Sequence, residues 1–355
     1  MLYLILGIAL VAVVLWEAFE TIVLPRRVTR RFRLTKFFYR ATWLPWSRLA
    51  GAIRSKRRGE TLLSFFGPLS LLFLLVFWAS GLILGFALLH YALGTRLSAQ
   101  AGTPGWAIDL YMSGTTFFTL GLGDVTPAAW TARILTVLEA GTGFGFLAIV
   151  IGYLPVIYQS FSRREVIISM LDARAGSPPS AAELLRRHSQ DGAFEALTQL
   201  LRDWEQWSAE LLESHLSYPV LAYFRSQHDN QSWLSALTTI LDACAIVLSG
   251  IEGSPARQAR LTFAMARHAV VDLAQIFRYA PKPQPDRLPQ EDLSRLRASL
   301  LATGLQDPDG QRLAKLRRMY EPYVQSLAAY LRMPLPPWIP AATRKDNWET
   351  TAWDG

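Results

Sequence analysis

Cysteine is almost missing from this chain of 355 residues, in which Cys244 is the single one. A lone thiol excludes an intrachain disulfide and every metal site that needs several cysteines. The histidines of the second half have no recurrent metal-ligand spacing, and no phosphate-binding loop follows a predicted strand. No nucleophile and base occur in a catalytic pattern. The sequence therefore argues against an enzyme and against a bound cofactor.

Acidic residues are scarce in the first part of the chain. Residues 1–160 carry 14 Lys and Arg against 6 Asp and Glu, whereas residues 161–355 carry 22 of each. The whole net charge of +8 therefore lies in the first part. A nucleic-acid partner would require a basic face on a soluble domain, which this distribution does not favour. Basic cytoplasmic loops of a membrane protein explain it better.

Long apolar runs dominate the first part instead, in a chain that is 51% hydrophobic. Residues 2–24, 62–93 and 134–158 each exceed or match the roughly 20 apolar residues with which a helix crosses a bilayer. We therefore predict three transmembrane helices. The first run has no basic segment before it, which indicates an uncleaved anchor rather than a signal peptide.

The loops between the predicted spans differ in charge. Residues 25–60 hold 12 Lys and Arg and one acid, whereas Arg96 is the only basic residue of 94–129. By the positive-inside rule, the N-terminus lies outside, and residues 25–60 and the C-terminal half are cytoplasmic. The protein is thus predicted to be a multi-pass protein of the cell membrane. Cys244 should be a reduced, buried thiol.

Basic residues recur at every third position after the first span, at Arg27, Arg30, Arg33 and Lys36. That spacing resembles a voltage-sensor helix, but sensor arginines lie inside the membrane among countercharges. Here Pro25 separates the run from its span, and aromatic residues are interleaved with the charges. We therefore favour a helix at the cytoplasmic interface whose basic side chains face anionic lipids.

A glycine-punctuated loop lies between the second and third spans. The sequence TTFFTLGLGDVTP occupies residues 115–127, and residues 105–118 are long enough for a short re-entrant helix before it. Irregular backbone at membrane depth must be buried in protein or line water. Gly121 and Gly123 relax the limits on φ, so that successive carbonyls can turn toward one axis. Carbonyls from several chains could then replace the hydration shell of a cation.

The segment TFFTLGLGD at 116–124 resembles the T-x-x-T-x-G-x-G-D selectivity filter of potassium channels. The resemblance covers residues 61–160 and implies an outer helix, a pore helix, a filter and an inner helix. It implies that potassium ions, as the permeant ligand, are coordinated by Thr119, Leu120, Gly121, Leu122 and Gly123. It also implies that Thr116 and Asp124 support that filter.

Three features qualify this resemblance. Potassium channels usually have Tyr or Phe where this chain has Leu122, which leaves open a weakly selective cation channel. One pore loop cannot surround an ion, so the resemblance implies a homotetramer. No cyclic-nucleotide or dinucleotide module follows the inner helix, and no familiar ligand gate is indicated.

Glu139 lies within the third span, where a lone carboxylate is costly. It could brace the filter, or it could pair with a nearby hydroxyl such as that of Thr115 or Thr116. The same span holds the candidate gating-hinge residues Gly141, Gly143, Gly145 and Pro155. Close packing against neighbouring helices is the alternative role of these glycines.

The second half has apolar residues at intervals of three and four, which is typical of helices. Gly176, Pro178 and Pro179 break the helix that continues the third span, and Ser180 can cap the next helix with Glu183. Helices are expected near residues 181–216, 231–250, 255–279, 290–303 and 310–331.

The prediction is an all-α membrane protein with three transmembrane helices, a re-entrant pore helix and filter loop, and a cytoplasmic α-helical domain. Its segments are a transmembrane helix (1–24), a basic interfacial linker (25–60), the pore domain (61–160), a connector helix (161–176), the helical domain (177–332) and an irregular tail (333–355). The predicted function is a homotetrameric, potassium-selective channel with a regulatory domain. The alternative from another class is a membrane-anchored signalling or scaffold protein whose pore does not conduct.

Overall fold

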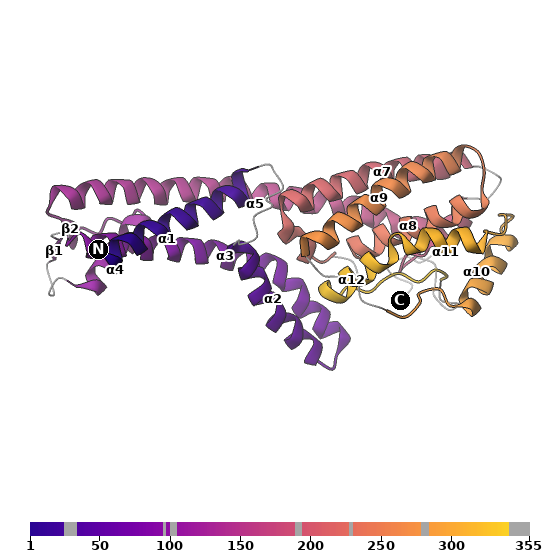
Figure 1. The fold of residues 1–355 in the computed structure, drawn as a ribbon, viewed down its shortest axis with the longest axis horizontal. Coiled ribbons are helices and arrows are strands. Elements are labelled where there is room, and N and C mark those ends of the chain that lie inside the picture. The colour runs from indigo at the N-terminus through magenta and orange to yellow at the C-terminus, as the bar shows by residue number, and fades with distance from the viewer. Residues whose placement is uncertain are drawn as a thin grey trace, which may run out of the picture. The chain divides into compact units, whose positions relative to one another are not determined.

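The chain forms two compact units, Met1–Tyr158 and Gln159–Gly355, and the boundary between them falls within helix α5 (Trp130–Ala175). Both are helical, as the sequence predicts (Figure 1). The computed structural model describes residues 1–24, 34–94, 97–99, 105–188, 194–226, 230–277 and 284–340. Of the residues expected to face lipid, Lys36 belongs to α2, and the others lie outside the described residues: Arg27, Arg30 and Arg33.

Unit 1 consists mainly of long apolar helices. They are α1 (Leu2–Ala18) with a π-helical turn (Phe19–Val23), α2 (Leu34–Ala52), α3 (Lys56–Ala92), α4 (Trp106–Phe117) and the first part of α5. Helices that are apolar on every side are stable only inside protein or in lipid. The exposed large hydrophobic residues of α1, α3 and α5 therefore suit a membrane.

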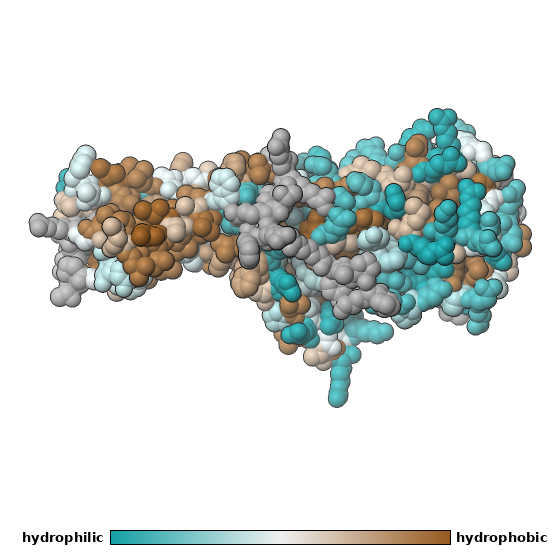
Figure 2. Space-filling model, viewed as in Figure 1, coloured by the Kyte–Doolittle hydropathy of each residue, from teal (hydrophilic) through white to brown (hydrophobic). Residues whose placement is uncertain are grey.

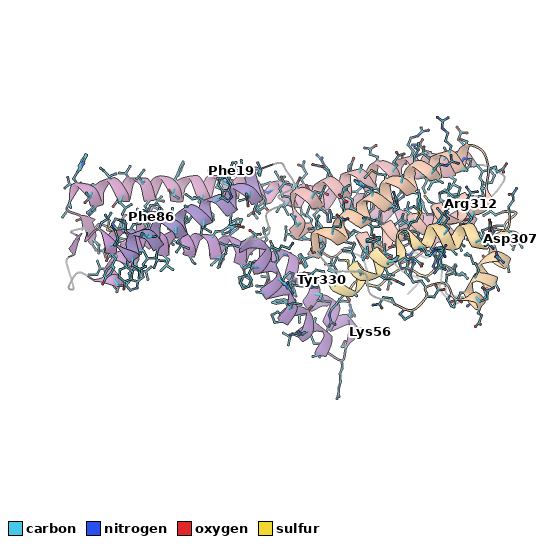
Figure 3. All side chains as sticks on the ribbon, viewed as in Figure 1. Phe19, Lys56, Phe86, Asp307, Arg312 and Tyr330 are labelled. Atoms are coloured by element: carbon cyan, nitrogen blue, oxygen red, sulfur yellow. The ribbon has the colours of Figure 1, made fainter. Side chains whose placement is uncertain are left out.

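Helix α1 packs along α3, and small residues let the two backbones approach (Figure 1). A Cβ atom at Gly7 would lie 2.9 Å from the carbonyl oxygen of Gly85, so neither position tolerates a larger side chain without a shift. Further along the same contact, Val14 and Trp78 are fully buried. Phe86, labelled in Figure 3, extends the buried contact. Close packing of this kind, rather than the hydrophobic effect, holds helices together in lipid.

Helix α2 pairs with the first part of α3 in a hairpin whose tip carries Lys56 (Figure 3). The 37 residues of α3 would extend about 55 Å, more than the roughly 30 Å of a hydrocarbon core. Its start therefore belongs to the segment that the sequence assigns to the interfacial linker. The Trp46 indole N–H donates to the Leu62 carbonyl at 2.9 Å, and the rings of Trp43 and Phe66 lie 4.8 Å apart.

A short antiparallel ribbon, which the sequence did not indicate, joins β1 (Leu97–Ala99) to β2 (Val125–Pro127). Ser98 lies opposite Thr126. The first strand follows α3 and the second follows the glycine-punctuated loop. The ribbon therefore ties the exit of that loop to the end of the outer helix.

Unit 2 contains the last part of α5, a 3₁₀ turn (Pro219–Tyr223) and seven further helices among its described residues. The helices are α6 (Ala181–His188), α7 (Phe194–Ser217), α8 (Trp233–Gly250), α9 (Ser254–Phe277), α10 (Gln290–Ala302), α11 (Gly310–Arg318) and α12 (Glu321–Leu331). Helices α7 and α9 lie side by side, and both contact α8 (Figure 1). The core of unit 2 is therefore organised around α8.

Four helices of the described residues are long and apolar enough to cross a membrane: the first helix with its π-helical turn (Leu2–Val23), α3, α5 and α8. The sequence predicts three spans and places the segment of α8 in the helical domain. Protein already buries 94% of the apolar window of α8. Since this leaves no apolar face for lipid, we assign α8 as a core helix.

Two expected helices are each divided in the structure. The stretch near 310–331 is α11 followed by α12, and Pro322 lies in the first turn of α12, where its missing N–H costs nothing. The stretch near 181–216 is likewise α6 followed by α7. The predicted cap is confirmed, because the Glu183 N–H donates to the Ser180 hydroxyl at 3.4 Å.

Candidate functional site

Helix α4 ends at Phe117, and the chain turns at once into the glycine-punctuated loop. The Leu120 N–H donates to the Thr115 carbonyl at 2.8 Å, and the Thr119 N–H donates to the Thr116 carbonyl at 3.0 Å. These bonds satisfy carbonyls at the end of the helix that would otherwise lack partners. Thr116, an expected filter support, thus holds the loop through its backbone.

Backbone conformation alternates along the loop. Thr119 has φ +57°, Gly121 +54° and Gly123 +81°, whereas Leu120 and Leu122 between them do not have positive φ. A left-handed residue between residues of ordinary φ re-aims its peptide group, so alternation can bring successive carbonyls to one side of the chain. Carbonyls arranged in this way are the groups with which a channel filter replaces an ion's water.

Thr119 is the unexpected member of this pattern. A β-branched residue with positive φ is a genuine outlier and costs of order 1–3 kcal/mol. Such strain persists only where the surroundings impose it, and the turn from α4 does so here through the Thr119 N–H. The sequence indicated the conformational freedom of the glycines but not this strained threonine.

Leu120 and Leu122 of the loop are 61% and 64% exposed within the single chain. An apolar side chain at membrane depth that its own chain does not cover must be covered by lipid or by another chain. One chain therefore does not supply the packing for these two side chains.

Asp124 follows the second loop glycine. The Tyr111 hydroxyl of α4 donates to its carboxylate at 2.8 Å. This bond links the outer end of the loop to the first half of the preceding helix. The structure thus gives Asp124 a partner on α4, and its support of a filter stays a prediction.

Glu139 of α5 is completely buried. The Ser113 hydroxyl of α4 lies within hydrogen-bond distance of the Glu139 carboxylate and of the Ile83 carbonyl of α3, the latter at 2.7 Å, and its single proton donates to one of them at a time. The Nε2 atom of His90, also completely buried on α3, lies 3.4 Å from the other Glu139 oxygen. Glu139 therefore joins the inner helix to α4 and α3, through partners other than the threonines named from the sequence.

Gly143 of α5 lies directly against the end of α4. A Cβ atom at Gly143 would overlap the carbonyl oxygen of Phe117, two residues before Thr119. By contrast, a Cβ at Gly141 or Gly145 would meet nothing within 4 Å in this chain. The close-packing role is therefore observed for Gly143 alone among these three. Pro155 lies inside α5, which continues past it to Ala175.

Residues 71–159 match the model of a family described as ion channel. This segment is therefore similar to the ion channel family. The chain is also 24% identical over 191 residues to the "Uncharacterized membrane protein YdjJ" of Bacillus subtilis (strain 168), covering 53% of this chain and 55% of the relative. The chain thus spans about half the length of that curated relative. No solved structure matches.

The family match confirms the resemblance drawn from the loop residues at the level of the ion channel family. Residues 71–159 therefore resemble the pore domain of an ion channel, and the long apolar helices indicate a membrane protein. Ion channels conduct passively and are not a family of enzymes. Within the described residues, no group of three or more His, Cys, Asp and Glu side chains could hold a metal ion.

His90 and Ser113 are members of the channel domain's buried polar cluster that sequence reasoning missed. The signal for His90 was present, because an ionisable side chain inside an apolar span is a functional candidate by default. Ser113 carried no such signal, since serine is common in membrane helices. Its role follows only from its position between Glu139 and α3.

Proposed function

We propose that the protein is a homotetrameric, potassium-selective channel that conducts through the backbone carbonyls of residues 119–122. The observation that carries the proposal is the alternation of left-handed φ at Thr119, Gly121 and Gly123. It lies between a short helix and a long apolar helix, in the segment that matches the ion channel family. We propose that no cofactor is needed beyond the permeant ion.

The tetramer is proposed because one loop supplies only one side of an ion site. The exposure of Leu120 and Leu122 supports it, since a neighbouring chain could cover them. Helix α5 also exposes Val137 and Phe144, while a side chain at Gly141 would meet nothing in the same chain. These positions are available for subunit contacts near the loop.

We further propose that the N-terminus lies outside and that unit 2 is a cytoplasmic regulatory domain, on the basis of the charge asymmetry between the loops. Arg164, near the end of α5, is buried in unit 2 and donates to the Leu221 and Phe224 carbonyls, each at 2.9 Å. Because α5 is a continuous helix, a rearrangement of unit 2 that displaces Arg164 would act directly on the inner helix.

Leu122 supports a second candidate, a weakly selective cation channel. No hydrogen bond from its side chain can brace the filter, as a tyrosine hydroxyl could. A less rigid filter discriminates less between ions of different size. The two candidates differ only in the ratio of potassium to sodium permeability.

The test is ion flux in liposomes that contain the purified full-length protein, with reversal potentials under opposed potassium and sodium gradients. Gly121→Ala should abolish potassium flux, because alanine at φ +54° re-aims a filter carbonyl. Gly94 has the same φ of +54° and also has nothing within 4 Å of an added Cβ, but it lies outside the filter. Gly94→Ala is therefore the matched control and should conduct like the parent.

The same assay separates the alternatives. A parent that passes sodium as readily as potassium would favour the weakly selective channel, and Leu122→Tyr should then raise the preference for potassium. Thr119→Ala should keep the flux and change block by larger cations, since the hydroxyl and methyl of the side chain are removed and the backbone carbonyls remain. If the parent shows no cation flux and behaves like Gly121→Ala, the channel hypothesis fails and the scaffold hypothesis replaces it.

A further inference from the structure

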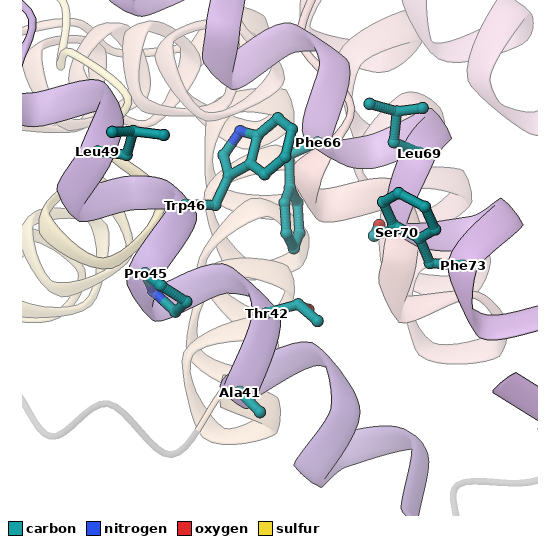
Figure 4. Close-up of a pocket in the computed structure, with 9 residues that line it drawn as sticks. All are labelled: Ala41, Thr42, Pro45, Trp46, Leu49, Phe66, Leu69, Ser70 and Phe73. Atoms are coloured by element: carbon teal, nitrogen blue, oxygen red, sulfur yellow. The ribbon is translucent and has the colours of Figure 1, made fainter.

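An apolar pocket lies between α2 and α3, within unit 1 (Figure 4). Its volume is about 530 Å³, inside the range of roughly 300–1,000 Å³ in which proteins hold small molecules. Helix α2 lines it with residues between Ala41 and Leu49, and α3 with residues between Phe66 and Phe73. The conduction pathway proposed above does not use this pocket.

The few polar groups of the pocket already have partners. The hydroxyl of Thr42 donates to the Phe38 carbonyl at 2.8 Å. The hydroxyl of Ser70 donates to a carbonyl of its own helix at 2.9 Å. The indole N–H of Trp46 donates to the Leu62 carbonyl. An occupant therefore finds no unsatisfied hydrogen-bonding group among these side chains and must be a hydrocarbon at this depth.

The rim of the pocket is open. Leu49 of α2 and Phe73 of α3 both line it, yet they are 59% and 52% exposed. Neighbouring large side chains of α3, Phe65, Leu72 and Val76, are exposed as well. In a membrane protein, such a surface meets the acyl chains of lipids. The entrance is thus positioned for a chain that enters from the bilayer.

Positive charge accompanies the pocket on α2. Arg48 lies three residues after the lining residue Pro45 and flanks the lined face of α2, whereas Arg40 lies on the opposite side of that helix. Both arginines are exposed, and neither forms an ion pair with another described residue. From residue 34 to residue 59 the hairpin has basic residues and no acidic one. The charge beside the pocket therefore complements an anionic head group, not a zwitterionic or cationic one.

We propose that this pocket binds one acyl chain of an anionic phospholipid, with the lipid phosphate paired to Arg48. Guanidinium groups pair with phosphate through charge-assisted hydrogen bonds, which fixes the head group above the entrance. The acyl chain then fills space between α2 and α3 that their own side chains leave empty. The site depends on the membrane location of unit 1 and not on ion selectivity.

The experiment is native mass spectrometry of the full-length protein, released from detergent after equilibration with equal amounts of palmitoyl-oleoyl phosphatidylglycerol and phosphatidylcholine. The parent should retain phosphatidylglycerol in preference. Ala41→Trp fills the pocket and should lower the retained lipid by at least about fivefold. Ala52→Trp places the same ring at an exposed position of α2 outside the pocket and should retain lipid like the parent.

The head-group contact is tested by a pair of variants. Arg48→Gln should reduce the preference for phosphatidylglycerol by about fivefold. Arg40→Gln removes the same charge from the opposite side of α2 and should leave most of that preference. An equal loss in both variants would mean that net charge, and not a site, attracts the lipid, and would overturn the head-group assignment.

A second measurement guards against a misfolded variant. Phosphatidylglycerol with a photoreactive group at the end of its acyl chain should cross-link the parent protein within residues 41–49 or 66–73. Cross-links confined to other segments would overturn the pocket assignment. Retention of lipid by Ala41→Trp at the parent level would also overturn the pocket assignment. So would a change in the oligomeric mass of Ala41→Trp without a change in its lipid count, because the pocket would then be a subunit contact. Lipid retention is read without any current, so a failure of conduction does not affect the result.

Discussion

Helices α5 and α8 are both apolar enough to cross a membrane, but they meet different surroundings. Protein buries 17% of the apolar window of α5 and 94% of that of α8. Unit 1 leaves Val137 and Phe144 of α5 exposed, whereas unit 2 buries every residue of α8 from Trp233 to Ser249. Composition therefore identifies a helix that avoids water, and the surrounding fold decides whether lipid or protein replaces the water.

The surfaces of the two units repeat this difference. Hydrophobic residues dominate the visible face of the spans in unit 1, while hydrophilic residues cover most of the visible face of unit 2 (Figure 2). The amphipathic helices α7 and α9 account for the second pattern, because they turn apolar residues toward α8 and polar ones outward. Unit 2 thus has the organisation of a water-soluble helical domain.

Each unit also buries a carboxylate, with different partners. Glu139 in unit 1 meets the neutral hydroxyl of Ser113 and a histidine. Asp242 in unit 2 meets the guanidinium of Arg287 at 2.7 Å and the hydroxyl of Tyr320. Removing Asp242 would leave the buried guanidinium of Arg287 with only its longer ion pair, to Glu321 at 3.4 Å, and this is the costlier loss.

The largest effect is therefore expected from Asp242→Ala. Breaking a buried ion pair costs about 3–5 kcal/mol, because the remaining charge stays desolvated. Asp292, in an exposed pair with Arg295, is the matched control, and Asp292→Ala should cost below about 1 kcal/mol. The measurement is denaturant unfolding of the full-length protein, followed by protease cleavage within unit 2. Equal costs for the two variants would contradict the assignment of α8 as the core of that unit.

A smaller effect is expected from the glycines of α5. Gly143→Ala forces a methyl group against the Phe117 carbonyl and should cost about 1–3 kcal/mol, with loss of flux if the adjacent loop is the proposed filter. Gly141→Ala meets no atom within 4 Å in the chain and should gain the roughly 0.5–1 kcal/mol by which alanine favours a helix. Thermal unfolding of the detergent-solubilised protein measures the stability of both variants, and liposome flux measures their conduction. If Gly143→Ala behaves like Gly141→Ala, α5 and the end of α4 are not in close contact.

The spans and the loop could be predicted from the sequence because both are local patterns. Apolar run length determines a span, and the glycine spacing of residues 119–123 constrains φ within the loop itself. The partners of Glu139 could not be predicted in this way, since Ser113 is 26 residues distant and lies on another helix. Long-range pairing depends on how helices pack, which no local pattern encodes. The left-handed φ of Thr119 likewise opposes the preference of a β-branched residue and is imposed by the turn from α4.

In unit 2 the sequence indicated the positions of the helices more reliably than their continuity. The stretch near 310–331 has a helical period throughout, yet it divides before α12. Pro322 was the available signal, because proline favours the first turn of a helix over its interior. The burial of α8 was not predictable from its own residues, since it results from contacts with α7, α9 and other helices around it.

The smallest effect concerns a buried histidine of unit 2 and the pH dependence of stability. His215 donates from Nδ1 to the Leu211 carbonyl at 2.8 Å, so its Nε2 atom is unprotonated and accepts from Arg164 at 3.2 Å. Burial, together with the adjacent positive charge of Arg164, holds the pKa of His215 well below its usual 6.5. The folded state therefore binds fewer protons than the unfolded state below about pH 6.5. The contribution of neutral His215 to the free energy of unfolding is complete above that pH and is lost as pH falls.

His215→Gln keeps an acceptor for Arg164 but removes the titration. The free energy of unfolding of the parent, minus that of His215→Gln, should fall by up to about 1.4 kcal/mol per pH unit as the pH is lowered from about 6.5 to 5. Other titrating groups, including Asp242 and Glu321, occur in both proteins and cancel in this difference. The exposed His268 provides the control, because His268→Gln should not change the slope in that way. A difference that stays constant across this range would show that His215 is not held neutral beside Arg164. The contact between Arg164 of α5 and His215 of α7 would then need another description.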